Sequence, residues 1–341
     1  MGKLQVWIIE LRAPFLTASL VSIVLGTVIA WTRNNLFNLQ YFLLALLAGV
    51  FLHLGTNVAN DYYDHRSGND EVNKEFVRPF SGGSRTIQLG LLTPREVISG
   101  AMLFFASATV IGVYLAWVRG PLVLALGLIG IFSGLFYTAP PINWVSRGIG
   151  EAIVGLNFGA LMTMGSYFVQ TQEVALEPLI ASLPVSLLIA AVLYINEFPD
   201  YKADKAVGKK TTVVRLGRKK AVYGYALIVL GAYASVIASL LAGIVPPYTI
   251  VALIPLPLAA AAVKHAFRFH SEPFGLVPAN ATTILIHLLT GLLISLGYIT
   301  FSFEIASVGF IVAWLLIGTC AFFTIHFYVK IWRSRKPSQP A

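Results

Sequence analysis

The sequence is poor in charge, and this shortage already restricts what the protein can be. Charged residues make up 11% of the 341 positions, whereas soluble globular domains carry about 25%. Hydrophobic residues make up 57%, and the mean hydropathy is +0.77. This balance excludes an ordinary water-soluble domain and favours a protein whose surface faces lipid.

Cysteine is also scarce, and no cleavable leader is recognisable. Cys320 is the single cysteine, which excludes an internal disulfide and leaves a buried, unreactive thiol as its expected role. The start, MGKLQVWIIELRAPF, lacks the short apolar core followed by small residues that is typical of a signal peptide. We expect it to form a short interfacial helix instead.

Long apolar runs are abundant. About 20 apolar residues cross the hydrocarbon core of a membrane as a helix, and the chain contains about ten such runs. They lie near residues 13–32, 40–60, 97–117, 120–139, 149–170, 177–196, 221–243, 247–266, 279–300 and 305–329. The runs are continuous rather than short and alternating, so they predict membrane-spanning helices and not strands. The gaps between them leave no room for a separate soluble domain.

The positive charges are distributed unevenly between the two sides of these expected spans. When the connections are assigned alternately to two sides, all but two of the 24 Lys and Arg residues fall on one side. The exceptions are Arg33 and Arg119. Because basic residues are retained on the cytoplasmic side, we expect both termini in the cytoplasm and an even number of spans. The net charge of +9 is then largely topological, and we expect no nucleic-acid partner.

A cluster of acids and amides follows the second apolar run, in NVANDYYDHRSGND (residues 57–70). Asn60 and Asp64 are four residues apart and share one face of a continuing helix. Asp61 lies beside them, and Asp70 follows Gly68. A carboxylate at the membrane edge is costly unless a cation or a metal pairs with it, so the cluster predicts a polar site.

The same spacing occurs again after the sixth run. NEFPDYKADKAVGKK begins with Asn196 and places Asp200 and Asp204 at further steps of four. Each copy is followed by a basic loop, and four runs separate the copies, so both lie on one side of the membrane. Asx residues also form helix ends and turns without any other role, but that interpretation accounts for one copy better than for two.

Diphosphate chemistry suits this pattern. Mg²⁺ prefers oxygen ligands from a few carboxylates, completed by water and substrate phosphate. Two facing carboxylate clusters would hold Mg²⁺ on either side of a diphosphate, and Lys or Arg would neutralise charge on the leaving group. An apolar surround suits a lipid tail. We therefore expect a site that ionises an allylic diphosphate, after which an electron-rich acceptor attacks the carbocation.

Three segments resemble the UbiA superfamily of intramembrane prenyltransferases. Two are the acidic motifs, in NDYYDHRSGND and NEFPDYKADKAVGKKTTVVRLG. The third, FYTAPPINWVSRGIGEAIVGLNFGALMTMGSYFVQT (residues 136–171), is similar to the branch that prenylates 1,4-dihydroxy-2-naphthoate in menaquinone biosynthesis. The resemblance extends from about Arg12 to about Ile299. It implies an all-α, polytopic membrane helix bundle with nine transmembrane helices and an active site on the cytoplasmic side.

The resemblance implies transfer of a polyprenyl group from an allylic diphosphate to an aromatic acceptor, with Mg²⁺ as cofactor. The implied acceptor is 1,4-dihydroxy-2-naphthoate, and the implied location is the inner or plasma membrane of a prokaryotic cell. Sibling enzymes that use 4-hydroxybenzoate, homogentisate, a tetrapyrrole or a glycerol phosphate lipid stay open, because acceptor choice depends on pocket shape. A membrane transporter is a more distant alternative, since its carboxylates usually lie near the bilayer midplane.

The resemblance also implies roles by position. The implied Mg²⁺ ligands are Asn60, Asp61, Asp64, Asp200 and Asp204. The implied diphosphate contacts are Asn60, Asn196, Arg78, Arg85 and Lys209. Tyr137 matches a tyrosine near the reacting carbon, although an interfacial belt of aromatic residues also explains a tyrosine there. The implied catalytic residues are Asp64, Asp200, Asp204 and Tyr137.

Two features depart from the family pattern. Gly68 stands where the first motif commonly has a third acid, and Asp70 follows two residues later, which leaves the role of Asp70 open. The run at 305–329 predicts a tenth span beyond the usual nine. We therefore divide the chain into a prenyltransferase membrane domain at 1–300 and a C-terminal helix with a basic tail at 301–341. His53 and Asn157, within apolar runs, are expected to hydrogen-bond between helices or to line an acceptor pocket.

Overall fold

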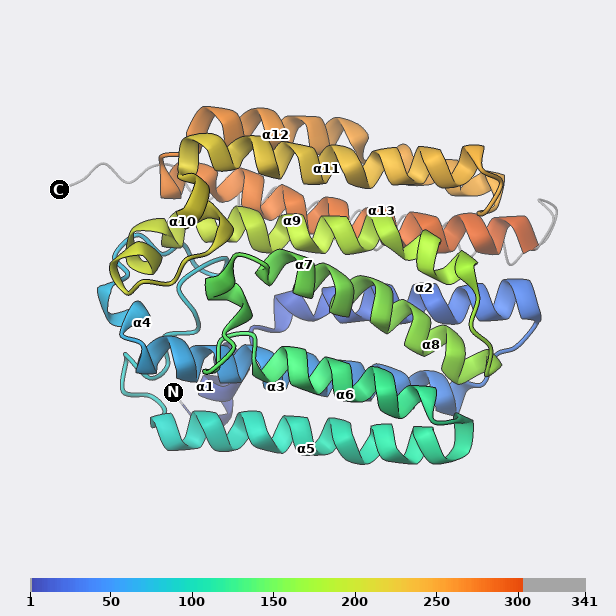
Figure 1. Ribbon diagram of the computed structural model, residues 1–341, viewed down its shortest axis with the longest axis horizontal. Helices are drawn as coiled ribbons and strands as arrows, with labels where there is room; N and C mark the ends of the chain where they lie inside the picture. Colours follow the sequence, from blue (N-terminus) through green and yellow to red (C-terminus); the bar gives the residue numbers. More distant parts are fainter. Residues whose placement is uncertain (1, 303–341) are drawn as a thin grey trace.

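The computed structural model describes residues 2–302, which form one bundle of helices running in a common direction (Figure 1). Every regular element in this part of the chain is a helix, and none is a strand. The all-α prediction is confirmed for these residues. The expected tenth span lies outside them.

The long helices of the bundle match the apolar runs of the sequence. They are α2 (Thr17–Asn34), α3 (Leu39–Arg66), α5 (Pro94–Arg119), α6 (Leu122–Leu135), α9 (Leu176–Ala206), α11 (Arg218–Leu241), α12 (Leu256–Phe269) and α13 (Val277–Ser302). One further element is composite and consists of α7 (Gly150–Gly155), a π-helical turn (Leu156–Leu161) and α8 (Met162–Thr171). Short 3-10 turns (Ala13–Leu16, Pro247–Leu253 and Pro273–Leu276) precede α2, α12 and α13.

Seven helices in the described chain are long and apolar enough to cross a membrane. They are α3, α5, the composite helix, α9, α11, and α12 and α13 with their preceding turns. α2 and α6 coincide with the two other expected spans, and α6, with 14 residues, is shorter than a full crossing. The protein is a multi-pass integral membrane protein.

Two helices form the centre of the bundle. α9 packs against α7, α11 and α13, and α13 also packs against α2 and α12. Val185 and Leu188 of α9 are fully buried, as are Ile286 and Leu296 of α13. The two motif-bearing helices therefore differ in position, because α9 is central whereas α3 exposes much of its apolar surface.

The outer helices expose large apolar side chains. Trp117 of α5 is 83% exposed, and Leu241 of α11 is 84% exposed. Water would disfavour such a surface, but lipid tails are as apolar as these side chains. The exposed apolar residues thus mark the surface that faces the hydrocarbon core.

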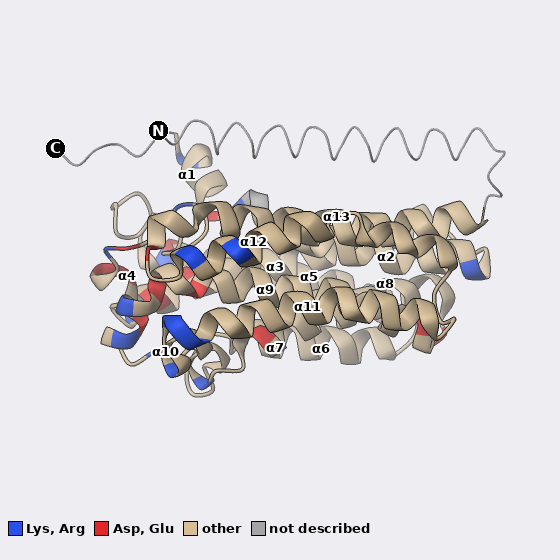
Figure 2. Cartoon of the chain, turned by 90° about the horizontal axis from the view of Figure 1, so that it is seen from above, with Lys and Arg blue, Asp and Glu red and all other residues tan. Residues whose placement is uncertain are grey.

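Charged side chains gather at one end of the bundle (Figure 2). That end carries three short helices, α1 (Lys3–Glu10), α4 (Asn69–Val72) and α10 (Thr212–Leu216), and a 3-10 turn at Trp144–Arg147. At the other end, Arg33 of α2 forms an ion pair with Glu177 of α9 at 2.9 Å. The asymmetry matches the uneven distribution of Lys and Arg in the sequence and puts the C-terminal ends of α3 and α9 at the charged end.

Candidate active site at the charged end

The ends of α3 and α9 frame a cavity of about 190 Å³ at the charged end. The α3 residues on its wall recur every three or four positions and so form one face of the helix. They are His53, Thr56, Asn57, Asn60 and Asp64. On α9, Asn196, Asp200 and Asp204 line the same cavity. The two acidic motifs, 136 residues apart by their first asparagines, therefore meet in one space.

Most of the predicted site residues contribute to this wall. Those that line the cavity are Asn60, Asp64, Tyr137, Asn196, Asp200, Asp204 and Lys209. Asp61, Arg78 and Arg85 are not among its lining residues. Asp70 does line it, although the sequence left its role open.

Lys209, which follows the second motif, is bound to the first. Its Nζ donates to both carboxylate oxygens of Asp64, at 2.8 and 3.0 Å, and lies 3.8 Å from Oδ1 of Asp204. Asn60 also donates to Asp64, from Nδ2 to Oδ2 at 3.1 Å. One cation thus ties the two motifs together.

Two asparagines that follow the first motif bind the second motif in return. Nδ2 of Asn69 donates to Oδ1 of Asp204 at 2.9 Å, and Nδ2 of Asn73 donates to Oδ1 of Asp200 at 2.7 Å. The asparagines are four residues apart, as the aspartates are, so the spacing of α4 matches that of α9. Neither asparagine was expected in the site, but the repeated spacing of four in NDEVN is a signal that the sequence contains.

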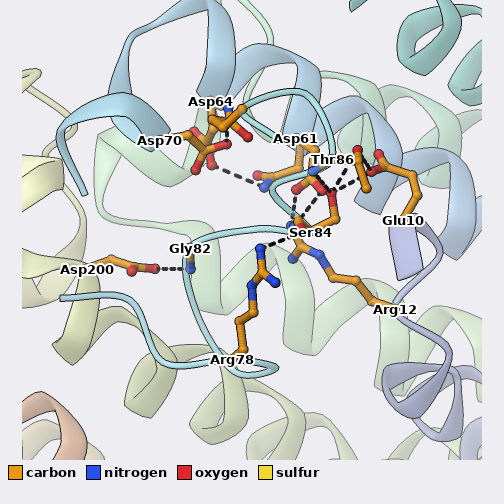
Figure 3. A network of polar contacts seen from close by, with 12 residues as sticks. Glu10, Arg12, Asp61, Asp64, Asp70, Arg78, Gly82, Ser84, Thr86 and Asp200 are labelled. Atoms are coloured by element: carbon orange, nitrogen blue, oxygen red, sulfur yellow. Dashed lines mark hydrogen bonds and ion pairs between the residues drawn. The ribbon is translucent and has the colours of Figure 1, made fainter. Parts of the chain in front are cut away.

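Asp61 is buried and does not itself line the cavity. Its Oδ1 pairs with the guanidinium group of Arg12. Its Oδ2 accepts a hydrogen bond from the backbone N–H of Ser84 at 2.9 Å. Figure 3 shows Asp61 between these two partners. This geometry favours an anchoring role for Asp61 over the metal-ligand role that the resemblance implies.

Arg78 and Arg85 lie on the loop between α4 and α5. Nη2 of Arg78 donates to the carbonyl oxygen of Ser84 at 3.3 Å, and the guanidinium of Arg85 lies 4.3 Å from the ring centroid of Phe76. The cations on the cavity wall are instead Lys209 and Arg12. Arg12 was not expected there, and its position directly before the first apolar run is the only sequence signal for it.

Two of the predicted residues, Asn196 and Tyr137, are held in different surroundings. Oδ1 of Asn196 accepts a hydrogen bond from Nδ2 of Asn280 in α13 at 2.7 Å. Tyr137 lies after α6, and its burial, together with the charge of Glu197, raises the pKa of Tyr137 well above its ordinary value. Its hydroxyl therefore stays protonated. Glu197, which was not expected in the site, lines the cavity as well.

The titration of two groups outside the spanning helices reflects the crowding of charge. Burial alone would lower the pKa of Lys209, but the carboxylates of Asp64 and Asp204 raise it above its ordinary value, so Lys209 is charged. Burial and the nearby charge of Asp64 raise the pKa of Asp70 to about 7. Its Oδ2 accepts a hydrogen bond from Nε2 of Gln88 at 3.2 Å.

A second cavity, of about 160 Å³, lies between α3, α5, α6 and α8, and aliphatic side chains and glycines make up most of its wall. A narrow space of about 20 Å³ lies between the two cavities. It shares Tyr137 and Phe158 with the acidic cavity, and Leu52 and Met162 with the apolar one. Three adjacent spaces therefore follow one another from the acidic motifs into the apolar part of the bundle.

The donors on the cavity wall are suitable for a hard divalent cation. Within residues 2–302, no three His, Cys, Asp or Glu side chains are close enough together to hold a metal ion by themselves. Mg²⁺ does not need three, because one or two carboxylates together with water and phosphate complete its octahedron. Oδ1 of Asn69, beside Asp204, is buried without a hydrogen-bond partner. An unpaired oxygen next to carboxylates fits Mg²⁺.

The fold and the cavity together define an integral membrane helix bundle with an acidic site at one end and an apolar space beneath it. The profile of the UbiA prenyltransferase family matches residues 19–273. The chain belongs to this family of prenyltransferases.

Individual relatives show how far the similarity extends. The chain is 28% identical over 286 residues to the 1,4-dihydroxy-2-naphthoate octaprenyltransferase of Bacillus subtilis, which covers 84% of this chain and 89% of that protein. It is 31% identical over 262 residues to the protein of the same name from Mycobacterium tuberculosis, covering 76% and 85%. The structure of a UbiA homolog from Archaeoglobus fulgidus bound to DMAPP and Mg²⁺ matches with a TM-score of 0.57 at 18% identity, over 84% of this chain and 98% of that one. This last likeness shows the fold.

Proposed function

We propose that this protein transfers a polyprenyl group from an allylic diphosphate to 1,4-dihydroxy-2-naphthoate, as a step of menaquinone biosynthesis. The observation that carries the proposal is the single cavity that Asp64 shares with Asp200 and Asp204. Similarity to naphthoate octaprenyltransferases over most of the chain supports the choice of acceptor.

The acidic motifs would hold Mg²⁺ with the diphosphate. We assign this role to Asn60, Asp64, Asp200 and Asp204, with Oδ1 of Asn69 as a further acceptor. When bound, Mg²⁺ neutralises the charge of the diphosphate and so makes it a better leaving group. The match to the Archaeoglobus fulgidus homolog with DMAPP and Mg²⁺ supports this choice of metal.

The cations of the cavity would bind the diphosphate oxygens. Nζ of Lys209 already lies between carboxylates of the two motifs, so it can give one contact to a phosphate oxygen without leaving the cavity. Nε of Arg12 is buried without a hydrogen-bond partner and faces the same space. Arg78 and Arg85 would act from the loop beside the cavity, and Asn196 would donate its amide.

Reaction at this site would break the bond between C1 of the prenyl group and the diphosphate oxygen, which keeps the electron pair. A ring carbon of the naphthoate would then attack the allylic cation, and the ring would regain its aromaticity by losing the group on that carbon, either a proton or the carboxyl group as CO2. Tyr137 lies where the acidic cavity narrows, and its ring face favours a neighbouring positive charge. The apolar cavity beyond would take the isoprene units, because its wall removes them from water.

We further propose that the charged end faces the cytoplasm of a prokaryotic cell and that both termini lie there. The uneven distribution of Lys and Arg supports this orientation. Nine spans within residues 1–300 and a tenth helix within 301–341 complete the proposed topology.

The test is prenyl transfer in nanodiscs with 1,4-dihydroxy-2-naphthoate and allylic diphosphates of increasing length, with and without Mg²⁺. We expect prenylated naphthoate and an equal amount of released diphosphate only when Mg²⁺ is present. Product with another acceptor, such as 4-hydroxybenzoate, but none with the naphthoate would make the protein a sibling enzyme. Absence of diphosphate binding would overturn prenyl transfer altogether.

A further inference from the structure

A short loop segment connects the two acidic motifs. We call residues 81–86, with the sequence SGGSRT, the bridging segment. The backbone N–H of Gly82 donates to Oδ2 of Asp200 at 3.3 Å, and the backbone N–H of Ser84 donates to Oδ2 of Asp61 at 2.9 Å. The bridging segment therefore extends from the end of α9 to the end of α3, and Gly82 and Gly83 contribute to the cavity wall.

The conformation of the bridging segment is demanding, and its backbone–backbone hydrogen bonds, at Ser81, Arg85 and Thr86, join it to residues outside the segment. Gly82, Gly83 and Arg85 have φ values of 74°, 69° and 63°, a region that residues with a Cβ rarely adopt. A Cβ at Gly83 would lie 3.0 Å from Oδ1 of Asp61. The segment belongs to no helix, so contacts from outside it must hold it in place.

Glu10, the last residue of α1, supplies such a contact. Its Oε2 accepts hydrogen bonds from the hydroxyl groups of Ser84 and Thr86 (Figure 3). Its side chain is completely buried, and no described Lys, Arg or His forms a salt bridge with it. Burying a carboxylate with only two hydroxyl partners is costly, and an apolar residue of similar volume is often at least as stabilising. The stability of the folded protein therefore does not explain why this position has a carboxylate rather than an apolar side chain.

α1 itself is held against α5 along one face. Val6 is buried against Val97 and Ala101 of α5, and the ring of Trp7 lies directly over Gly100, where a Cβ would come within 2.5 Å of it. Glu10 thus extends from a helix that is packed on the bundle. Its carboxylate transmits that fixed position to the bridging segment.

Arg12 completes the arrangement from the same stretch of chain. It pairs with Asp61, which in turn accepts the hydrogen bond from the N–H of Ser84. Ser84 is therefore held through its hydroxyl by Glu10 and through its backbone by the Asp61–Arg12 pair. Its carbonyl oxygen accepts a hydrogen bond from Arg78, so the position of Ser84 also determines where that guanidinium lies.

We propose that Glu10 is a positioning residue for prenyl transfer, which holds the bridging segment so that Gly82 and Gly83 keep their place on the cavity wall where the diphosphate would bind. The inference rests on the proposed function. Loss of Glu10 releases the bridging segment but leaves the carboxylates and the acceptor cavity in place.

The test compares Glu10→Leu with wild-type protein in nanodiscs. The variant removes both hydrogen bonds to a buried charge, which weakens diphosphate binding by about tenfold or more. We expect the Kd for geranyl diphosphate with Mg²⁺ to rise by that factor, and KM for the naphthoate and the unfolding temperature to stay near wild type. Hydrogen exchange of residues 81–86 should become faster, while α9 keeps its protection. Glu96→Gln is the matched control, because Glu96 pairs α1 with α5 through Lys3 but does not contact the bridging segment.

A second variant keeps the test decisive if Glu10→Leu folds poorly. Ser84→Ala with Thr86→Val removes the two hydroxyl donors and should reproduce the loss of diphosphate affinity. Combined with Glu10→Leu, it should add little, because both changes remove the same hydrogen bonds. Unchanged geranyl diphosphate affinity in either variant overturns the role of Glu10 but leaves the proposed function standing. Wild-type protein that binds no geranyl diphosphate overturns the proposed function, and the role of Glu10 with it.

Discussion

The two acidic motifs have the same spacing but different electrostatic surroundings. In the first motif, Asp64 is paired with Lys209, and Asp61 with Arg12. In the second, Asp200 and Asp204 accept hydrogen bonds from asparagine amides and a backbone N–H, which are neutral groups. Within residues 2–302, the second motif meets a cation through Lys209, whose Nζ lies 3.8 Å from Oδ1 of Asp204.

This difference bears on where a metal ion would bind. A neutral donor stabilises a carboxylate without cancelling its charge, whereas an ion pair cancels most of it. The second motif also lies on a central helix, where low polarity strengthens electrostatic interactions. When both motifs are ionised, the second therefore has less of its negative charge compensated by cations, and we expect Mg²⁺ binding to depend more on Asp200 and Asp204 than on Asp64.

The largest effect should come from neutralising the second motif. Asp200→Asn is expected to lower kcat/KM by about 100- to 1000-fold, since it removes a charge that would act directly on the Mg²⁺–diphosphate group. Asp64→Asn should also lower kcat/KM severely. Its Mg²⁺ concentration for half-maximal turnover, however, should rise less than that of Asp200→Asn. Turnover measured against Mg²⁺ concentration checks both points, with thermal unfolding as the control for folding. Near-normal turnover in Asp200→Asn at saturating Mg²⁺ would sink the assignment.

The cation that joins the motifs should rank next. Lys209→Met is expected to reduce affinity for the prenyl diphosphate by about 100-fold, because it removes a buried charge and leaves Asp64 unpaired. Lys210→Met is the matched control, since Lys210 is its exposed neighbour. Diphosphate binding and turnover of the two variants should be compared side by side. Equal behaviour of the two would show that Lys209 is only a loop charge.

A neutral partner of the second motif should have a smaller effect. Asn73→Ala removes the hydrogen bond to Asp200 and is expected to cost about tenfold in kcat/KM. Asn34→Ala, at the far end of the bundle, removes a hydrogen bond with Tyr167 and should leave turnover unchanged. Steady-state kinetics with saturating naphthoate distinguishes them. A loss in Asn73→Ala as large as in Asp200→Asn would mean that the amide does more than orient the carboxylate.

The smallest effect concerns stability and pH at Asp70. Burial and the charge of Asp64 raise the pKa of Asp70 from 3.8 to about 7, so the folded protein binds this proton more tightly than the unfolded chain does. The resulting stability is fully present below about pH 4 and is lost as the pH rises towards 7. Asp70→Asn removes that loss of stability. The unfolding temperature of the variant minus that of the wild type should therefore become larger as the pH is raised from about 5 to about 8. A difference that stays constant over this range would contradict the shifted pKa.

Local patterns predicted a large part of the fold and of the cavity wall. Continuous apolar runs predicted the helices of residues 2–302, because the cost of exposing backbone groups to lipid leaves little alternative to a helix. The spacing of Asn60 and Asp64 predicted a shared face on α3, and the cavity lies on that face. Helical periodicity depends only on residues a few positions apart, so the residues that share a helical face can be predicted from the sequence.

Other features of the site depend on contacts between distant segments. Lys209 and Asp64 are separated by 145 positions, and Asn73 and Asp200 by 127. No local pattern states which basic or amide residue meets which carboxylate. For the same reason Arg12 was not expected on the cavity wall, and Arg78 and Arg85 were expected closer to it than they lie.

By itself the sequence determined that the protein is a helical membrane bundle with two acid-rich helix ends on one side, because hydropathy and spacing act over a few turns of chain. Only the tertiary structure decided that cations pair with the first motif, that neutral amides hydrogen-bond to the second, and that Asp61 anchors a loop. These outcomes depend on how α3 and α9 are rotated towards each other and on the path of the bridging segment. Both are set by packing across the whole bundle, in which residues far apart in the chain compete for the same few carboxylates.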